Sequence, residues 1–160
     1  MILVTAGVLA EPTAAQLQAV AQVFDQYRQH YGEPAAPQQT LDWITDRHAC
    51  GQLAIFAAYR GEELIGLATT VVIPASLRLS QYWQLRDLYV VPGARRCGAA
   101  RVLIGAVQRA AAEAGALRLS VQTESGNAAA LALYRSSGFT PVIGLKALML
   151  PLHAASDGRP

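Results

Sequence analysis

The sequence predicts one α/β domain in which helices cover both faces of a mixed sheet. An apolar fraction of 52% against a charged fraction of 15% is typical of a folded globule and not of a disordered chain. Two apolar runs on either side of the turn Arg60–Glu63 indicate an antiparallel hairpin. The second half of the chain then alternates strand and helix patterns, which favours parallel pairing of strands there.

The 160 residues suit a single domain, which we expect to span residues 1–152, with residues 153–160 as a flexible tail. The expected order of elements is strand, helix, helix, strand, strand, strand, helix, strand, helix, strand. Thr13, with Gln16 three residues later, has the pattern of a capping box, and Thr40 can cap a second, shorter helix. We expect strands at residues 2–8, 53–59, 64–73, 82–91, 117–123 and 142–150, and the later helices at residues 98–114 and 127–137.

Charge, cysteine use and hydropathy exclude several classes of protein. With 13 Lys and Arg against 11 Asp and Glu, the formal net charge of +2 is too balanced to favour a nucleic-acid partner. Cys50 and Cys97 form neither a metal-ligand spacing nor a disulfide framework. No apolar run reaches membrane-spanning length, and the N-terminus lacks the basic region of a signal peptide. We therefore expect a soluble cytoplasmic protein without a metal, membrane or nucleic-acid partner.

A strand, a turn and a long helix meet in the segment 85–114. The first turn of a helix has free backbone N–H groups and the positive end of the helix dipole. Small residues from Gly98 to Ala100 would let a phosphate approach these groups, and nearby arginines add positive charge. Solvated arginines at an ordinary strand-to-helix turn would explain the same pattern, and the spacing matches neither a dinucleotide fingerprint nor a P-loop. The candidate pyrophosphate site consists of Arg95, Arg96, Cys97, Gly98, Ala99, Ala100 and Arg101.

Two sequence blocks resemble the signatures of one enzyme family, the GNAT acetyltransferases. The run Arg95-x-x-Gly98-x-Ala100 resembles the family's Arg/Gln-x-x-Gly-x-Gly/Ala motif and follows a strand that ends near Val90. The blocks occur in family order with family spacing, and the resemblance covers residues 53 to 150. It implies the family's mixed, mostly antiparallel sheet in a small single-domain bacterial member. The second block is Asn127-x-x-Ala130-x-x-Leu133-Tyr134-x-x-x-Gly138-Phe139.

The resemblance also implies a reaction and its cofactor. Acetyl-CoA would donate its acetyl group to a primary amine, a small molecule or a peptide, which attacks directly in a ternary complex without a metal. The pantetheine arm would lie where one strand splays from its neighbour at a bulge and would pair with the backbone of that strand, and the pyrophosphate would sit at the start of the long helix. The cofactor contacts so implied are Leu88, Tyr89, Val90, Asn127, Ala130 and Tyr134, together with the pyrophosphate residues 95–101.

Tyr134 and Asp87 are the candidate catalytic residues. The resemblance aims the Tyr134 hydroxyl at the thioester sulfur, where it would protonate the departing thiolate, although packing of the helix onto the sheet explains the ring as well. The attacking amine must be neutral, so a base must accept a proton, and Asp87 lies near the acetyl group in the family's arrangement. Asp87 could equally orient a neighbour, and Glu124 is a second candidate. Asn127 is also an ideal helix N-cap, and we expect Cys97 to fill its loop although a thiol at a helix N-terminus can be reactive.

Tyr27, Tyr31 and Trp83, with Tyr82, are candidates for the wall of an acceptor pocket, although core packing also explains aromatic residues at these positions. The sequence has no cluster of acidic residues of the kind that would indicate a pocket for a polyamine. It does not identify the acceptor of the acetyl group. The resemblance also suggests a homodimer. Two other functions stay open: a non-catalytic acyl-CoA-binding or regulatory module on the same fold, and a nucleic-acid or protein-interaction domain that uses the patch from Arg95 to Arg101.

Overall fold

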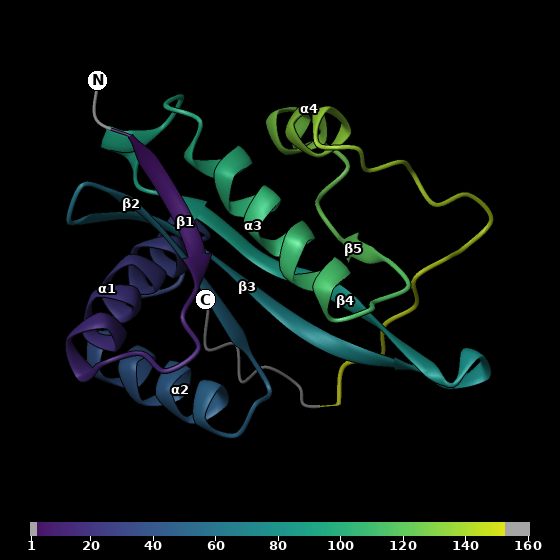
Figure 1. Cartoon of the computed structure of the whole chain (residues 1–160), viewed down its shortest axis with the longest axis horizontal. Coiled ribbons are helices and arrows are strands. Elements are labelled where there is room, and N and C mark those ends of the chain that lie inside the picture. The colour runs from purple at the N-terminus through teal and green to yellow at the C-terminus, as the bar shows by residue number, and fades with distance from the viewer. Residues whose placement is uncertain (1–2, 153–160) are drawn as a thin grey trace, which may run out of the picture.

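The computed structural model describes residues 3–152 of the chain (Figure 1). Its helices are α1 (Ala14–His30), α2 (Pro37–Ala49), α3 (Ala99–Glu113) and α4 (Ala128–Ser136). The five-stranded sheet has the order β1-β2-β3-β4-β5 and consists of β1 (Val4–Val8), β2 (Ala54–Arg60), β3 (Glu63–Ala75), β4 (Ser80–Val90) and β5 (Leu119–Val121). Strands β1 to β4 pair antiparallel with their neighbours, and β4 and β5 pair parallel, so the expected α/β fold with a mixed, mostly antiparallel sheet is confirmed.

Helices cover both faces of the sheet, with α1 and α2 on one face and α3 on the other (Figure 1). Successive strand residues point to opposite faces. Phe56 is therefore buried in the apolar cluster that contains Leu103 of α3, and its neighbour Ile55 is buried in the cluster that contains Val20 of α1. Burying one large apolar side chain stabilises the fold by roughly 1.5–3 kcal/mol, so these two clusters hold the helices on the sheet.

The caps of α1 and α4 are those that the sequence predicts. The hydroxyl of Thr13 accepts a hydrogen bond from the backbone N–H of Gln16 at 3.2 Å, and the Gln16 side chain accepts one from the N–H of Thr13 at 2.9 Å. At the start of α4, Asn127 Oδ1 accepts a hydrogen bond from the N–H of Ala130 at 3.1 Å. Both helices therefore begin with a polar side chain on their free N–H groups.

The second helix begins earlier than expected. It starts at Pro37, because the fixed φ of proline and its missing N–H suit the first position of a helix. Thr40, the expected cap, lies inside the helix and is buried. Its hydroxyl donates instead to the carboxylate of Asp25 on α1, at 3.0 Å.

The expected last strand, Val142–Leu150, is wrong: this segment has no regular structure and runs away from the sheet (Figure 1). Gly144 has a φ of +85°, which interrupts an extended backbone. The ladder of β5 also has only three residues, fewer than the expected 117–123, so it offers a short edge for pairing. The large apolar side chains between Val142 and Leu152 are consequently 73% to 94% exposed.

A bulge in β4 opens the sheet between β4 and β5. Thr69 of β3 lies opposite Asp87 and Thr70 lies opposite Leu85, which leaves Arg86 as an extra residue on β4. Beyond this bulge β4 continues to Val90, but its pairing with β5 ends at Leu85. The last residues of β4 therefore have a free edge.

Candidate active site

Two adjoining depressions meet beside the bulge. The larger, which we call the β4–α4 cleft, has a volume of about 670 Å³ and lies between the end of β4, the start of α3 and α4. The smaller, the α1–α2 pocket, has a volume of about 380 Å³ and is lined by side chains of the first two helices and by Asp87 of β4. Tyr27 and Tyr31 line both, so they stand at the junction.

The free edge of β4 faces the β4–α4 cleft. The N–H of Val91 bonds to the carbonyl of Ile65 on β3 at 2.9 Å, and alternate residues of a strand direct their backbone groups to opposite edges. Leu88 and Val90 therefore direct their N–H and C=O groups into the cleft, whereas those of Tyr89 face β3. The Val90 carbonyl already accepts a hydrogen bond from Arg95 Nε at 3.2 Å.

The start of α3 carries free backbone donors. Its N-cap is Gly98, with a φ of +87° and no side-chain cap, and Arg96 also has a positive φ of 62°. Among residues 3–152, the backbone N–H groups of residues 98–101 have no hydrogen-bond partner. Free N–H groups at a helix start, next to residues of positive φ, form a concavity that suits an anion.

The side chains of the predicted pyrophosphate loop do not all face the β4–α4 cleft. Arg95 and Ala100 line the cleft, whereas Arg96 and Arg101 are exposed beside it. The thiol of Cys97 donates to the carbonyl of Ala94 at 2.8 Å, as a loop-filling residue would.

Tyr134 lies on the α4 side of the cleft, next to Asn127 and Ala130. Its half-buried ring packs edge-on against Phe139, with ring centres 5.6 Å apart. Burial raises the pKa of the Tyr134 phenol, and electrostatic interactions with the neighbouring Tyr31 and with the Asp87 carboxylate raise it further. The phenol therefore keeps its proton at neutral pH and can donate it.

Asp87, directly after the bulge, is half-buried and accepts a hydrogen bond from the hydroxyl of Thr69. Burial raises the pKa of the Tyr27 phenol, and the neighbouring Asp87 carboxylate adds to the rise. Asp87 lines the α1–α2 pocket, and the second candidate base, Glu124, lines the β4–α4 cleft instead. The structure thus brings Asp87, Tyr27 and Tyr134 to one region.

The aromatic wall of the α1–α2 pocket was predicted only in part. Tyr27 and Tyr31 belong to it, but Trp83 lies in neither depression and packs against the core cluster beneath α3. Phe24 and Trp43 were missed. Phe24 shares the helical spacing of Tyr27 and Tyr31, which was a usable signal, whereas no pattern in the sequence links Trp43 to them. Tyr82 also lies elsewhere, with its ring against Arg118.

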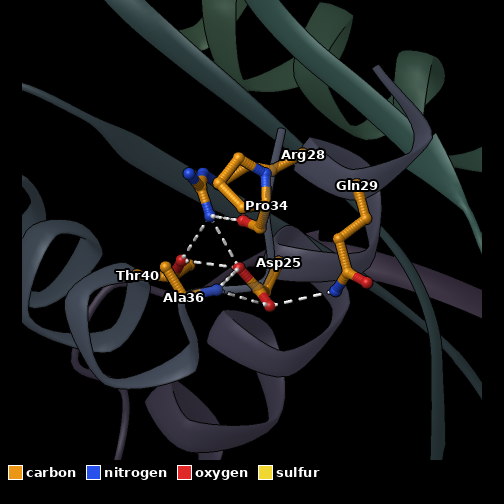
Figure 2. A network of polar contacts seen from close by, with 6 residues as sticks. All are labelled: Asp25, Arg28, Gln29, Pro34, Ala36 and Thr40. Carbon is orange, nitrogen blue, oxygen red and sulfur yellow. Dashed lines mark hydrogen bonds and ion pairs between the residues drawn. The ribbon is translucent and has the colours of Figure 1, made fainter. Parts of the chain in front are cut away.

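A buried carboxylate joins the two helices that form the pocket (Figure 2). Asp25 of α1 accepts hydrogen bonds from Arg28 at 2.8 Å, from the backbone N–H of Ala36 at 3.1 Å and from Thr40 of α2 at 3.0 Å. A further bond comes from Gln29 at 3.1 Å. Burial alone would raise the pKa of Asp25, but these hydrogen bonds and the charge of Arg28 outweigh it and lower the pKa.

The sequence model of the acetyltransferase (GNAT) family matches residues 17–139. The chain belongs to the GNAT acetyltransferase family. It is 32% identical over 121 residues to a Bacillus subtilis (strain 168) protein described as the uncharacterized N-acetyltransferase YhfO, covering 76% of this chain and 81% of that one. A Haemophilus influenzae protein described as a probable acetyltransferase is 33% identical over 75 residues, covering 46% of this chain and 51% of the other.

Solved structures agree with this assignment. The crystal structure of a probable acetyltransferase superposes with a TM-score of 0.84 and 28% identity, covering 95% of this chain and 99% of that one. An aminoglycoside acetyltransferase from an uncultured soil metagenomic sample, solved in complex with sisomicin, superposes with a TM-score of 0.78 and 18% identity, covering 94% of this chain and 97% of that one. At this low identity the similarity supports the fold and not the substrate. The expected class, an N-acetyltransferase of the GNAT family, is confirmed.

The family uses acetyl-CoA as its acetyl donor. The residues of this chain fit such a molecule, because the free edge of β4 offers N–H and C=O groups to an amide-containing arm and the start of α3 offers N–H groups to phosphates. Within the described range, no helix is long and apolar enough to cross a membrane. No group of three or more His, Cys, Asp and Glu side chains among residues 3–152 is placed to hold a metal ion.

Proposed function

We propose that this GNAT enzyme transfers the acetyl group of acetyl-CoA to a primary amine by direct attack, with both substrates bound at once. The observation that carries the proposal is the meeting of two depressions, which share Tyr27 and Tyr31 and have Asp87 and Tyr134 on their two sides. Donor and acceptor can then lie side by side, and holding two reactants together removes much of the entropic barrier to their reaction.

The donor would occupy the β4–α4 cleft. Leu88 and Val90 would pair with the pantetheine amides, for which Arg95 would release the Val90 carbonyl. The N–H groups of residues 96–101 would hold the pyrophosphate, and the exposed arginines Arg96 and Arg101 would add positive charge. Acetyl-CoA itself supplies the activated acetyl group as a thioester.

The proton transfers would fall to Asp87 and Tyr134. The amine attacks as the neutral base, and the carboxylate of Asp87 accepts the proton that the amine nitrogen loses. The Tyr134 phenol, which is protonated at neutral pH, gives its proton to the departing sulfur. Asp87 then returns its proton to solvent, and Tyr134 recovers one, so the enzyme is unchanged after each turnover.

The test is release of free CoA thiol when the enzyme, acetyl-CoA and members of an amine panel are mixed. The proposal expects saturable turnover with at least one primary amine and none with the corresponding tertiary amine. The aminoglycoside acetyltransferase of the same fold, solved in complex with sisomicin, supports small amines as the panel's starting point. Tight binding of acetyl-CoA without turnover of any amine would show a non-catalytic acyl-CoA-binding module instead.

A second experiment tests the base. Asp87→Asn keeps the size of the side chain and removes its ability to accept a proton, so kcat should fall by about 10²-fold or more, as for loss of a general base. Glu124→Gln is the matched variant on the β4–α4 cleft. A large loss of kcat in Glu124→Gln, with Asp87→Asn near the parental rate, would transfer the role to Glu124.

We also propose that the chain forms a homodimer through the segment Val142–Leu152. The apolar side chains of this segment are 73% to 94% exposed, more apolar surface in one stretch than a monomer ordinarily leaves in water. A second copy would bury them reciprocally. Light scattering across a concentration series should report a dimer for the parent and a monomer for Leu148→Asp. Leu77→Asp, at a fully exposed leucine on a hairpin tip, is the control and should stay dimeric.

A further inference from the structure

We infer that the α1–α2 pocket selects a small primary monoamine that carries one aromatic ring; the inference rests on the proposed acetyl transfer. The volume of the pocket, about 380 Å³, lies near the lower end of the range for small-molecule sites, roughly 300–1,000 Å³. It holds one ring on a short chain. The several substituted rings of an aminoglycoside, or a folded peptide, exceed it.

The walls of the pocket are aromatic and hold one another in place. The ring of Phe24 stacks on Trp43, with centres 5.9 Å apart, and meets Tyr27 edge-on at 5.5 Å. Tyr27 in turn meets Tyr31 edge-on at 5.2 Å. Trp43 is nevertheless 46% exposed and Tyr31 57% exposed, so their free faces line the pocket and are available to a ligand. Aromatic faces in this arrangement favour a flat ring as their partner.

The charges around the pocket favour one ammonium group. Arg28 is the cation that lines it, and its guanidinium is ion-paired with Asp25 at 2.8 Å. The lining carboxylates are those of Asp87 and Glu33, which oppose a ligand that carries a carboxylate group of its own. Aromatic rings also attract a cation through their faces. A linear polyamine would leave these rings without an apolar partner.

The orientation of the ligand follows from where Asp87 lies. This carboxylate lines the pocket and neighbours Tyr27, which also lines the β4–α4 cleft. The amine therefore belongs at the Asp87 side, next to the thioester. The ring of the acceptor then lies among Phe24, Tyr31 and Trp43.

The two tryptophans of the chain allow binding to be measured apart from turnover. Trp43 lines the pocket, whereas Trp83 packs in the core cluster. Trp83 Nε1 is buried without a hydrogen-bond partner in the described part of the chain, so Trp83→Phe removes an unsatisfied donor and should fold. Titrating this variant with phenethylamine, in the presence of CoA, should change the Trp43 emission to saturation. Trp43→Phe, which keeps only Trp83, should show no change.

Turnover gives the second readout. With the parent enzyme, kcat/KM for phenethylamine should exceed that for n-butylamine, spermidine and sisomicin by at least about tenfold, the smallest discrimination that a methylene-sized contact gives in an apolar pocket. Trp43→Ala should raise KM for phenethylamine with little change in KM for acetyl-CoA. Equal kcat/KM for n-butylamine, or a Trp43 emission that phenethylamine leaves unchanged, would overturn the inference. Absence of turnover with every amine would overturn the proposed function instead, and the Trp43 titration would still decide whether the pocket binds the ring.

Discussion

The β4–α4 cleft and the α1–α2 pocket meet at the same tyrosines, yet they are built from different parts of the chain. Besides its side chains, the cleft has backbone groups on two sides, namely the free edge of β4 and the start of α3 at Ala100. The pocket presents side chains, most of them aromatic, from α1 and α2. A backbone site needs only residues that permit its conformation, whereas a side-chain site changes with each substitution. Donor recognition can therefore stay constant while acceptor recognition changes.

The largest expected effect is at Tyr134, on the α4 side of the β4–α4 cleft. Tyr134→Phe keeps the ring that packs on Phe139 and removes the hydroxyl. If the phenol protonates the departing sulfur, kcat should fall by about 10²–10⁴-fold, the usual cost of losing a general acid. KM for acetyl-CoA should change little, because the loss is confined to the transition state. Steady-state kinetics with the best amine of the panel measure both.

The matched control for that experiment is Tyr82→Phe. Tyr82 also loses a hydroxyl in this variant, but it lines neither depression. It should keep the parental kcat. A Tyr134→Phe enzyme with the same kcat as Tyr82→Phe would show that Tyr134 only packs, and the acid would then be water or the ammonium formed on attack.

A smaller effect is expected where the cleft depends on backbone conformation. Gly98 has a φ of +87°, and a side chain added there would meet no atom within 4 Å, so Gly98→Val acts through the backbone. The left-handed conformation costs an L-residue roughly 1–2 kcal/mol, which corresponds to binding weaker by about five- to thirtyfold if the loop must be held in place by the ligand. Calorimetry with acetyl-CoA should show this loss of affinity.

Gly115 provides the control at the other end of the same helix. Its φ is +68°, and a side chain there would also meet nothing within 4 Å. Gly115→Val should therefore lower stability about as much as Gly98→Val and leave the affinity for acetyl-CoA unchanged. Equal affinities of the two variants would mean that the phosphates bind elsewhere.

The difference between the two regions also explains what the sequence could predict. The order of elements as far as α4, the two polar helix caps and the strand–turn–helix segment that leads into α3 all depend on contiguous residues, and the structure agrees with them. The bulge was implied by the family resemblance alone. The start of α2 at Pro37 and the irregular backbone at Gly144 were harder to predict from the sequence. In each case the φ angle of one residue overrode the secondary structure that the surrounding pattern favoured. The strand expected at Val142–Leu150 had suitable composition but lacked a long partner edge, which only the folded sheet reveals.

The aromatic wall of the α1–α2 pocket was harder to predict, because it is formed by residues that are far apart in the sequence. Phe24 and Trp43 come together because α2 packs beside α1, where Asp25 links the two helices by accepting hydrogen bonds from the N–H of Ala36 and the hydroxyl of Thr40. Trp83 was expected in the pocket because aromatic residues before the fourth strand suit a pocket wall. It points to the opposite face of the sheet, because one residue of strand register decides which face a side chain takes.

The smallest expected effect on turnover, and a clear effect on stability, belongs to Asp25. Asp25→Asn keeps the shape of the side chain but leaves one oxygen to accept hydrogen bonds from Arg28, Ala36 and Thr40. The free energy of unfolding should therefore fall by about 1–3 kcal/mol, the cost of leaving a buried polar group without a partner. Because the folded pKa of Asp25 lies below its ordinary value of 3.8, the carboxylate stabilises the parent above that value, and this stability is lost as the pH falls through the lower, folded pKa. Urea midpoints should thus differ between parent and variant at neutral pH and converge in acid, while Asp42→Asn, at an exposed carboxylate of α2 bonded to Gln38, should follow the parent throughout. A difference that persists unchanged in acid would assign the effect of Asp25 to packing and not to its charge.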